Sequence, residues 1–390
     1  MQSFNLLMPT ELIFGVGRHQ EIAKVIKRYG KSNVLVMYGE NFAIRSGLLN
    51  RVTDLLEGEE IDYVLYGGIT PNPEVKYVRE AKKIALEYEV DLILAIGGGS
   101  VIDVAKSVAV NFYYNGDELD FSKRIKTPTK ALALGVILTH ASAGSEMSGS
   151  CVISEAANNF KQGFRTDLVR PLFALTDPEL TYTLSPYQTA VGIVDSFMHS
   201  LERYFSKSGE IELADRFAEG IFITLKECAE VIIRDPQNEE VRANLMLAST
   251  FSHNDVTGIG KKVSMPAHAL EHALSALYPN VAHGHGLAII FPAWLSYYFD
   301  ELHYKIDRFA RIVFNLHDED IVTNARNGIN ALKDLFMRIG LTMNLRSLGV
   351  KKEDLPKLAD IVTDNGNKML YHDQKSLDKH DIIKIYDSTY

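Results

Sequence analysis

The stretch that decides the fold reads Asp91-Leu-Ile-Leu-Ala-Ile-Gly-Gly-Gly-Ser-Val-Ile-Asp-Val-Ala-Lys106. Its first part, through Ile96, is a short apolar run of the kind that forms a strand buried on both faces. The glycines that follow predict a turn, and the residues from Val101 onward continue with helical periodicity. This strand–turn–helix order predicts part of a βαβ unit, and therefore a parallel sheet.

The same alternation extends over the first half of the chain. Further β-rich runs occupy residues 33–38, 62–66 and 131–138, and a helix is predicted over residues 74–88. We therefore expect residues 1–184 to form an α/β domain with a mainly parallel sheet and helices on both faces. After Ser185-Pro186, a helix start signal, β-rich runs vanish and long amphipathic stretches dominate to the C-terminus. Residues 185–390 are therefore predicted to be all-helical.

Two loops of small residues follow strands of this sheet. In the turn Gly97–Ser100, bare backbone N–H groups and a helix N-terminus could receive a diphosphate, although a plain tight turn explains the glycines equally well. The turn lacks the G-x-G-x-x-G fingerprint. The second loop, Thr139–Glu146, adds support, and together the two loops favour a dinucleotide. Glu40, which ends the first of these strands, favours NAD because a carboxylate repels the 2′-phosphate of NADP; the alternative is a solvated loop acid.

Histidines and one aspartate gather in the second half of the chain. His268 and His272 lie four residues apart on a predicted apolar helix, and Asp195 and His199 have the same spacing on another. His283 and His285 follow in a glycine-rich segment, which we expect to be a loop. One such pair alone is an ordinary helix contact, but buried imidazoles and carboxylates are costly unless a cation binds them. An Asp/His set without Cys suits Fe²⁺, Zn²⁺ or Mn²⁺.

Charge and composition exclude several classes of protein. The 390 residues carry a net charge of −9 without a block of Lys or Arg, which disfavours binding to nucleic acids or anionic membranes. The first residues have no basic segment and no long apolar run, so we expect no signal peptide, and no stretch reaches the roughly eighteen apolar residues of a membrane span. Two cysteines are too few for a disulfide framework. A soluble cytoplasmic protein is expected.

Taken together, these residues resemble the iron-containing alcohol dehydrogenase family, in particular its butanol-dehydrogenase-like branch. The resemblance extends in order through almost the whole chain. It is carried by residues 5–17, 68–73, 97–106, 143–147 and 177–184, by Asp195-x-x-x-His199, and by His268-Ala-Leu-Glu-His272 with His283-Gly-x-Gly-Leu287. It implies an N-terminal dinucleotide-binding domain, an all-helical C-terminal domain, an active site in the cleft between them, and a homodimer.

The resemblance also assigns roles to residues. It implies that Asp195, His199, His268 and His283 bind the metal, Fe²⁺ or Zn²⁺, and that His272 lies near the nicotinamide, where it could relay a proton. The resemblance further implies that the cofactor is contacted by Glu40, Asn72, Gly97, Gly98, Gly99, Ser100, Asp103, Thr139, His140, Ser142 and Lys161. Some relatives carry a small residue at the position of Glu40 and use NADP. The carboxylate of Glu40 therefore supports NAD as the cofactor here, with NADP less favoured.

The chain departs from the family pattern in several places. The interval between His272 and His283 is one residue longer than expected, and His285 occupies a position that is usually small. Either His283 or His285 could therefore be the fourth ligand; the Gly-x-Gly-Leu pattern favours His283. Val263–Pro266 replace a Gly-Asp-Trp-like run, which weakens any inference about the substrate. His140 and Ser142 stand where the family more often has Pro or Thr.

The expected function is metal-assisted hydride transfer between a nicotinamide cofactor and a primary alcohol or aldehyde. A dehydroquinate-synthase-like lyase, which also uses NAD and a metal, would need a basic pocket, and apart from Lys261 and Lys262 the metal region has few basic residues. A non-catalytic NAD-binding protein is the other alternative, but it would have no use for Asp195 among apolar neighbours.

Overall fold

The computed structural model describes residues 2–206, 211–372 and 375–390. Contacts divide the chain into two compact units, one of residues 7–183 and the other of residues 184–390 together with residues 2–6. Gln2 joins the second unit through a hydrogen bond from its backbone N–H to the Gly260 carbonyl (3.0 Å). The sequence, in contrast, places residues 2–6 in the α/β domain and the boundary after residue 184.

The first unit is built on a sheet of six parallel strands in the order β1-β8-β5-β4-β2-β3. These strands are β1 (Glu11–Phe14), β2 (Asn33–Gly39), β3 (Asp62–Ile69), β4 (Leu92–Gly97), β5 (Ala133–Leu138) and β8 (Phe173–Thr176). An antiparallel hairpin of β6 (Ser150–Glu155) and β7 (Phe160–Arg165) stands apart from it. The four strands and the parallel sheet expected from the sequence are confirmed, whereas β1, β8 and the hairpin were not predicted.

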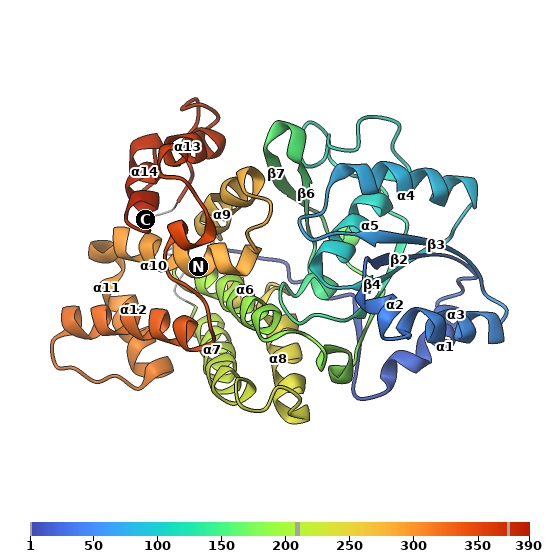
Figure 1. Cartoon of the computed structure of the whole chain (residues 1–390), viewed down its shortest axis with the longest axis horizontal. Coiled ribbons are helices and arrows are strands. Elements are labelled where there is room, and N and C mark those ends of the chain that lie inside the picture. Colours follow the sequence, from blue (N-terminus) through green and yellow to red (C-terminus); the bar gives the residue numbers. More distant parts are fainter. Residues whose placement is uncertain (1, 207–210, 373–374) are drawn as a thin grey trace. The chain divides into compact units, whose positions relative to one another are not determined.

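Helices cover both faces of this sheet. On one side lie α1 (Ile22–Arg28), α2 (Phe42–Arg45) and α3 (Leu48–Gly58), and on the other lie α4 (Val75–Glu87) and α5 (Gly99–Asn111) (Figure 1). Val34 and Leu94 of the inner strands pack in one core with Val52 of α3. Both faces of β2 and β4 are buried, because every residue from Val34 to Met37 and from Leu92 to Gly97 is shielded from solvent.

The strand order reverses between β2 and β4. From β2 the chain moves outward to β3, and it then returns past β2 to β4 and continues to β5 and β8. Open α/β sheets bind ligands at the carboxyl ends of the strands beside such a switch point. In this chain those ends are followed by Glu40 after β2 and by Gly98 after β4.

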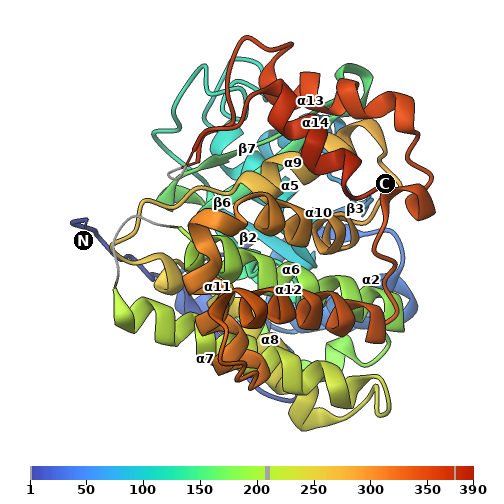
Figure 2. The ribbon, with the colours of Figure 1, turned by 90° about the vertical axis from the view of Figure 1, so that its left-hand side faces the viewer.

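The second unit is helical, as the sequence predicts. Its helices are α6 (Pro186–Tyr204), α7 (Glu212–Ile232), α8 (Glu239–Ser252), α9 (Pro266–Leu277), α10 (His283–Tyr297), α11 (Phe299–Phe314), α12 (Ile321–Arg338), α13 (Leu355–Thr363) and α14 (Lys379–Asp387). Within the described ranges, its only β pairing is the single bridge Leu370–Leu377. The helices α11 and α12 pack side by side (Figure 2). None of the helices in the described part of the chain has the length and apolar content needed to span a membrane.

The expectation that His283 and His285 lie in a loop is wrong, because α10 begins at His283. The glycines that suggested a loop instead mark tight helix packing. A Cβ atom at Gly284 would stand 2.1 Å from the backbone carbonyl oxygen of Val191 in α6, and one at Gly286 would stand 2.9 Å from Cγ of Glu271 in α9. Glycine therefore allows α10 to approach both helices closely, at the cost of its low helix propensity.

Candidate metal centre and cofactor site

The helix α6 carries Asp195 and His199 at its buried centre. Ser185 caps its N-terminus in a capping box with Gln188, and Pro186 occupies the first turn, as the sequence predicts. Asp195 and His199 are each 5% exposed. They share one face of α6 with Glu202, which follows seven residues after Asp195 and is also buried. Three ionisable side chains on one buried face require a counter-charge or polar partners.

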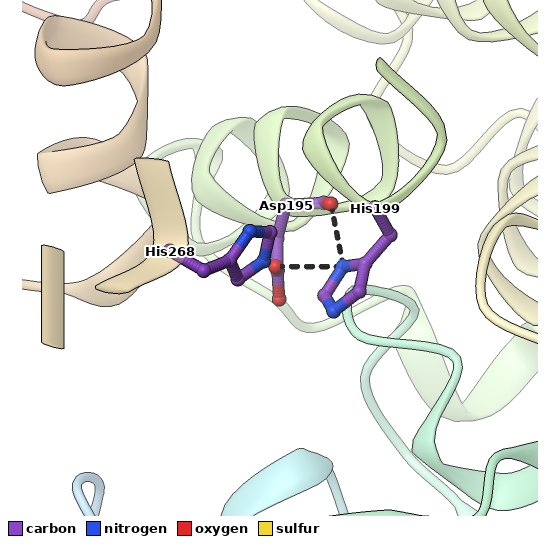
Figure 3. A group of neighbouring side chains, drawn as sticks. All are labelled: Asp195, His199 and His268. Carbon is purple, nitrogen blue, oxygen red and sulfur yellow. Dashed lines mark hydrogen bonds and ion pairs between the residues drawn. The ribbon is translucent and has the colours of Figure 1, made fainter. Parts of the chain in front are cut away.

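Two further helices bring histidines to this face. His268 comes from α9, and its ring centroid lies 4.6 Å from that of His199 (Figure 3). His283, at the first position of α10, has its ring centroid 5.3 Å from that of His268 and its Nε2 atom 3.8 Å from Oδ1 of Asp195. One carboxylate and three imidazoles, from three helices, therefore converge on one place.

In each of these imidazoles, Nδ1 is held by an oxygen of the protein. His199 Nδ1 donates to the backbone carbonyl of Asp195 (2.8 Å), and it also lies 3.1 Å from the Oδ1 atom of that residue. His268 Nδ1 bonds the carboxylate of Glu202, and His283 Nδ1 bonds the carboxylate of Glu271. An Nδ1 atom that donates in this way leaves the Nε2 lone pair for a metal ion, and metal-bound histidines usually have such an outer partner.

The residues fit a divalent ion. Among the described residues, the buried Nε2 of His268 has no hydrogen-bond partner, and the buried Oδ1 of Asp195 has no close polar contact besides Nδ1 of His199, an arrangement that costs free energy unless a cation binds there. Ligand atoms of Asp195, His199 and His268 all lie within 4.8 Å of one another. Three imidazoles with one carboxylate suit Fe²⁺ or Zn²⁺.

Electrostatics prepares two of these ligands for the ion. Burial raises the pKa of Asp195, but His199 and the other imidazoles outweigh it, so this pKa lies well below its ordinary value. Burial lowers the pKa of His268 well below its ordinary value, so its imidazole is neutral. Burial also raises the pKa of Glu202 to about 8. A cation nearby favours the ionised carboxylate, and therefore the arrangement in which the proton resides on Nδ1 of His268.

His272 and His285 have different surroundings. The half-buried ring of His272 lies against that of His283, with a centroid distance of 5.4 Å and an interplanar angle of 29°. His285 faces elsewhere: its Nδ1 lies 3.1 Å from the Tyr187 hydroxyl and its Nε2 lies 3.0 Å from the Thr342 carbonyl oxygen. Both nitrogens of His285 are thus occupied away from Asp195.

In the first unit, the two small-residue loops touch each other. A Cβ atom at Gly98 would stand 3.0 Å from Cβ of His140, and one at Gly99 would stand 3.4 Å from Cβ of Ala143. The Thr139 N–H donates to the Gly97 carbonyl (3.1 Å). A Cβ atom at Gly97 would meet Val101 of α5 at 2.5 Å, so the turn needs glycine at this position. Ser100, Thr139, His140 and Ser142 accordingly lie along the carboxyl ends of β4 and β5.

Of the other candidate cofactor residues, Glu40 and Asn72 follow strands of the sheet, whereas Asp103 bonds other groups of the protein. Glu40 is exposed, directly after β2 at the switch point. Asn72, with a φ of 56°, follows β3, and its Oδ1 atom accepts a hydrogen bond from Lys161 Nζ (2.9 Å). Asp103, in contrast, points into the protein, where it accepts hydrogen bonds from Ser145 Oγ (2.9 Å) and the Val152 N–H (3.1 Å).

Sequence reasoning missed several residues of these sites. The carboxylates of Glu202 and Glu271 bond His268 and His283, respectively, and the ring of His253 lies against that of His199 with a centroid distance of 3.9 Å. Lys106 is fully buried, and its Nζ atom donates to Ser145, Ser148 and Ser150, which fixes the loop after β5. Only Glu202 leaves a sequence signal, because it continues the face that Asp195 and His199 begin.

Known proteins resemble this chain along its full length. The family described as iron-containing alcohol dehydrogenase matches residues 9–178, and its C-terminal counterpart matches residues 189–390. NADH-dependent butanol dehydrogenase A of Clostridium acetobutylicum is 35% identical over 392 residues, which cover 100% of both chains. The NADPH-dependent aldehyde reductase YqhD of Escherichia coli is 34% identical, with 95% of each chain covered.

A solved structure agrees with this match. The crystal structure of NADH-dependent butanol dehydrogenase A from Thermotoga maritima has a TM-score of 0.95 at 33% identity, and the match covers 100% of this chain and 99% of that one. The family matches together span most of the chain and include Asp195 and the three histidines that converge on it. The chain therefore belongs to the iron-containing alcohol dehydrogenase family and is an NAD(P)-dependent alcohol and aldehyde oxidoreductase.

Proposed function

We propose that this chain interconverts short primary alcohols and aldehydes with NADH, and that Asp195, His199, His268 and His283 hold the divalent ion. The observation that carries the proposal is the buried Nε2 atom of His268, which has no hydrogen-bond partner among the described residues and lies beside the ligand atoms of Asp195 and His199. The preference for butanol-sized substrates rests on the similarity to butanol dehydrogenases.

The ligand residues supply the place for the chemistry. A divalent ion held there supplies Lewis acidity, which makes the alkoxide form of an alcohol accessible near neutral pH and polarises an aldehyde carbonyl. Asp195 contributes the negative charge of the set, and His199, His268 and His283 contribute imidazole nitrogens. Fe²⁺ is the ion we propose, with Zn²⁺ as the alternative that the same donors would accept. His283 is preferred to His285 because its Nε2 atom faces Asp195.

Residues of the first unit bind the nicotinamide cofactor in this proposal. The Gly97–Ser100 turn receives the diphosphate at the N-terminus of α5, where the helix dipole favours negative charge. Glu40 accepts hydrogen bonds from the adenosine ribose and disfavours NADP. Thr139, His140, Ser142, Asn72 and Lys161 complete the site. Asp103 acts through Ser145 and Val152 rather than by contact with the cofactor.

His272 is the proposed proton relay. Its ring is half-buried and stacks beside His283, so it lies next to the proposed metal ligands without being needed to fill the set. An imidazole titrates near neutral pH and can pass a proton between the reacting oxygen and solvent. The expected homodimer and the cytoplasmic location stay predictions. The full-length similarity to butanol dehydrogenases favours this function over the lyase and non-catalytic alternatives.

The test is an assay of the purified protein with butyraldehyde and either NADH or NADPH. Turnover is measured as isolated, after chelation, and after addition of Fe²⁺ or Zn²⁺. We expect NADH oxidation that the chelator abolishes and Fe²⁺ restores. Turnover that survives removal of all metal would contradict the metal assignment. A preference for NADPH would contradict only the role of Glu40.

A further inference from the structure

Two buried glutamates stand behind the proposed metal ligands. Glu202 is 2% exposed and Glu271 is fully buried, and their carboxylates bond Nδ1 of His268 and of His283, respectively. A buried carboxylate is costly, and one that only packed in a core would be replaced at no loss by an apolar side chain. Their common feature is that each faces the side of a ligand imidazole opposite to Nε2.

Glu202 has a second partner that fixes the direction of its carboxylate. Its Oε1 atom accepts the backbone N–H of Ala267 (2.6 Å), in the first turn of α9. The N-cap residue of α9, Met265, provides no side-chain cap, so Glu202 caps this helix from α6. With Oε1 occupied in this way, Oε2 is the atom that meets His268.

The packing around Glu271 points to the same arrangement. Gly286 lies opposite its side chain, and a Cβ atom there would stand 2.9 Å from Cγ and 3.2 Å from Oε1 of Glu271. The missing side chain at Gly286 makes room for this glutamate beside His283. A larger residue would displace the carboxylate from the ligand.

We infer that Glu202 and Glu271 are positioning residues that place the proton of His268 and of His283 on Nδ1, so that both present Nε2 to the metal. A carboxylate can hold a proton donor at Nδ1 and also increases the basicity of the imidazole toward the ion. The inference rests on the proposed ligation by His268 and His283. It adds that metal affinity depends on a carboxylate beside Nδ1 of these histidines, and that an amide in the same place would not serve.

The substitution Glu202→Gln separates this role from that of a helix cap. The amide oxygen can still accept the Ala267 N–H, which turns the amide NH₂ toward Nδ1 of His268. Nδ1 must then accept, the proton moves to Nε2, and His268 can no longer bind the ion. In the opposite orientation the amide oxygen would accept from Nδ1 of His268, but the amide NH₂ would then face the Ala267 N–H, and two donors repel. Neither orientation therefore keeps both the hydrogen bond from Ala267 and the one from His268.

The experiment compares metal-free wild-type protein, Glu202→Gln and Glu271→Gln with the control Glu219→Gln. Glu219 is equally buried in the same helical unit, but its carboxylate bonds Tyr204 and Arg308 instead of a histidine. Zn²⁺ affinity is measured by competition with a chromophoric chelator, the ligand set by the visible spectrum of Co²⁺-loaded protein, and folding by circular dichroism.

We expect Glu202→Gln to fold and to bind Zn²⁺ about 10- to 100-fold more weakly, with an altered Co²⁺ spectrum. Glu271→Gln should also weaken binding, and Glu219→Gln should bind as wild type. A residue that acted only as a cap would change stability but leave affinity and spectrum intact. Unchanged affinity in both test variants, an equal loss in the control, or failure of both test variants to fold without metal would overturn the inference. If wild-type protein bound no metal, the proposed ligand set itself would fail.

Discussion

The Nε2 atom of His283 lies 3.8 Å from Oδ1 of Asp195, although 88 residues separate them along the chain. The close approach of α10 to α6, permitted by Gly284, brings the two together. His285, two residues further along α10, is held by Tyr187 and Thr342 instead. Two neighbouring histidines of one helical turn therefore have different partners, and single substitutions can test whether His283 alone is needed for metal binding.

His283→Gln should weaken metal binding by more than about 100-fold, because it removes a ligand rather than an outer partner. His285→Gln should retain the metal, since neither nitrogen of His285 faces Asp195. Metal content after dialysis against a weak chelator, measured by mass spectrometry, tests both variants. Retention by His283→Gln together with loss by His285→Gln would reverse the assignment.

Glu40→Ser should change the cofactor preference toward NADPH by at least tenfold in the ratio of kcat/KM values, which corresponds to about 1.4 kcal/mol. The physical reason is the removal of a carboxylate that repels the 2′-phosphate. Glu87→Ser is the matched control, because Glu87 is an exposed acid at the end of α4, before β4 begins and thus at the opposite edge of the sheet. Equal changes in both variants would point to net charge rather than to the position of Glu40.

The buried side chain of Lys106 should make the free energy of unfolding depend on pH in a specific way. Burial lowers its pKa from 10.5 to about 8, so between these two values the unfolded chain binds a proton that the folded chain does not. Stability must therefore rise with pH over this interval, by up to about 3 kcal/mol, and the gain is lost as the pH falls to 8. Urea unfolding at pH 7.5 and 9.5 should show wild type gaining about 2 kcal/mol relative to Lys106→Met. An equal pH response of the two proteins would contradict the assignment.

The parts of the fold that could be predicted are those with a strong local pattern. The runs of β2 and β4 are apolar at successive positions, and the helix expected over residues 74–88 is α4, Val75–Glu87. The strands β1 and β8 have four residues each, too few for a periodic signal. The hairpin of β6 and β7 mixes polar with apolar residues, so neither strand shows a clear alternation.

The candidate site divides in the same way. Asp195 and His199, like His268 and His272, could be found because the four-residue spacing of a helix face is visible in the sequence. Glu271 could not be found, since an acidic residue on a helix usually faces solvent and its partner His283 belongs to another helix. The glycines around His283 and His285 were misread as a loop, because the sequence does not show that Val191 lies against Gly284.

The close packing at Gly284 allows a test of how the fold positions His283. In Gly284→Ala, the new Cβ atom would stand 2.1 Å from the Val191 backbone oxygen, a contact that no side-chain rotation can relieve. The start of α10 must therefore move away from α6 and carry His283 with it, although no ligand has changed. We expect a loss of about 1–3 kcal/mol in unfolding free energy and at least about tenfold weaker Zn²⁺ binding, since metal ligands tolerate displacements of only about 0.5 Å. Gly220→Ala, in α7 with no atom within 4 Å of the new Cβ, should leave binding unchanged and stabilise the helix by up to about 1 kcal/mol. Wild-type affinity in Gly284→Ala would show that α10 can shift without moving His283 from Asp195.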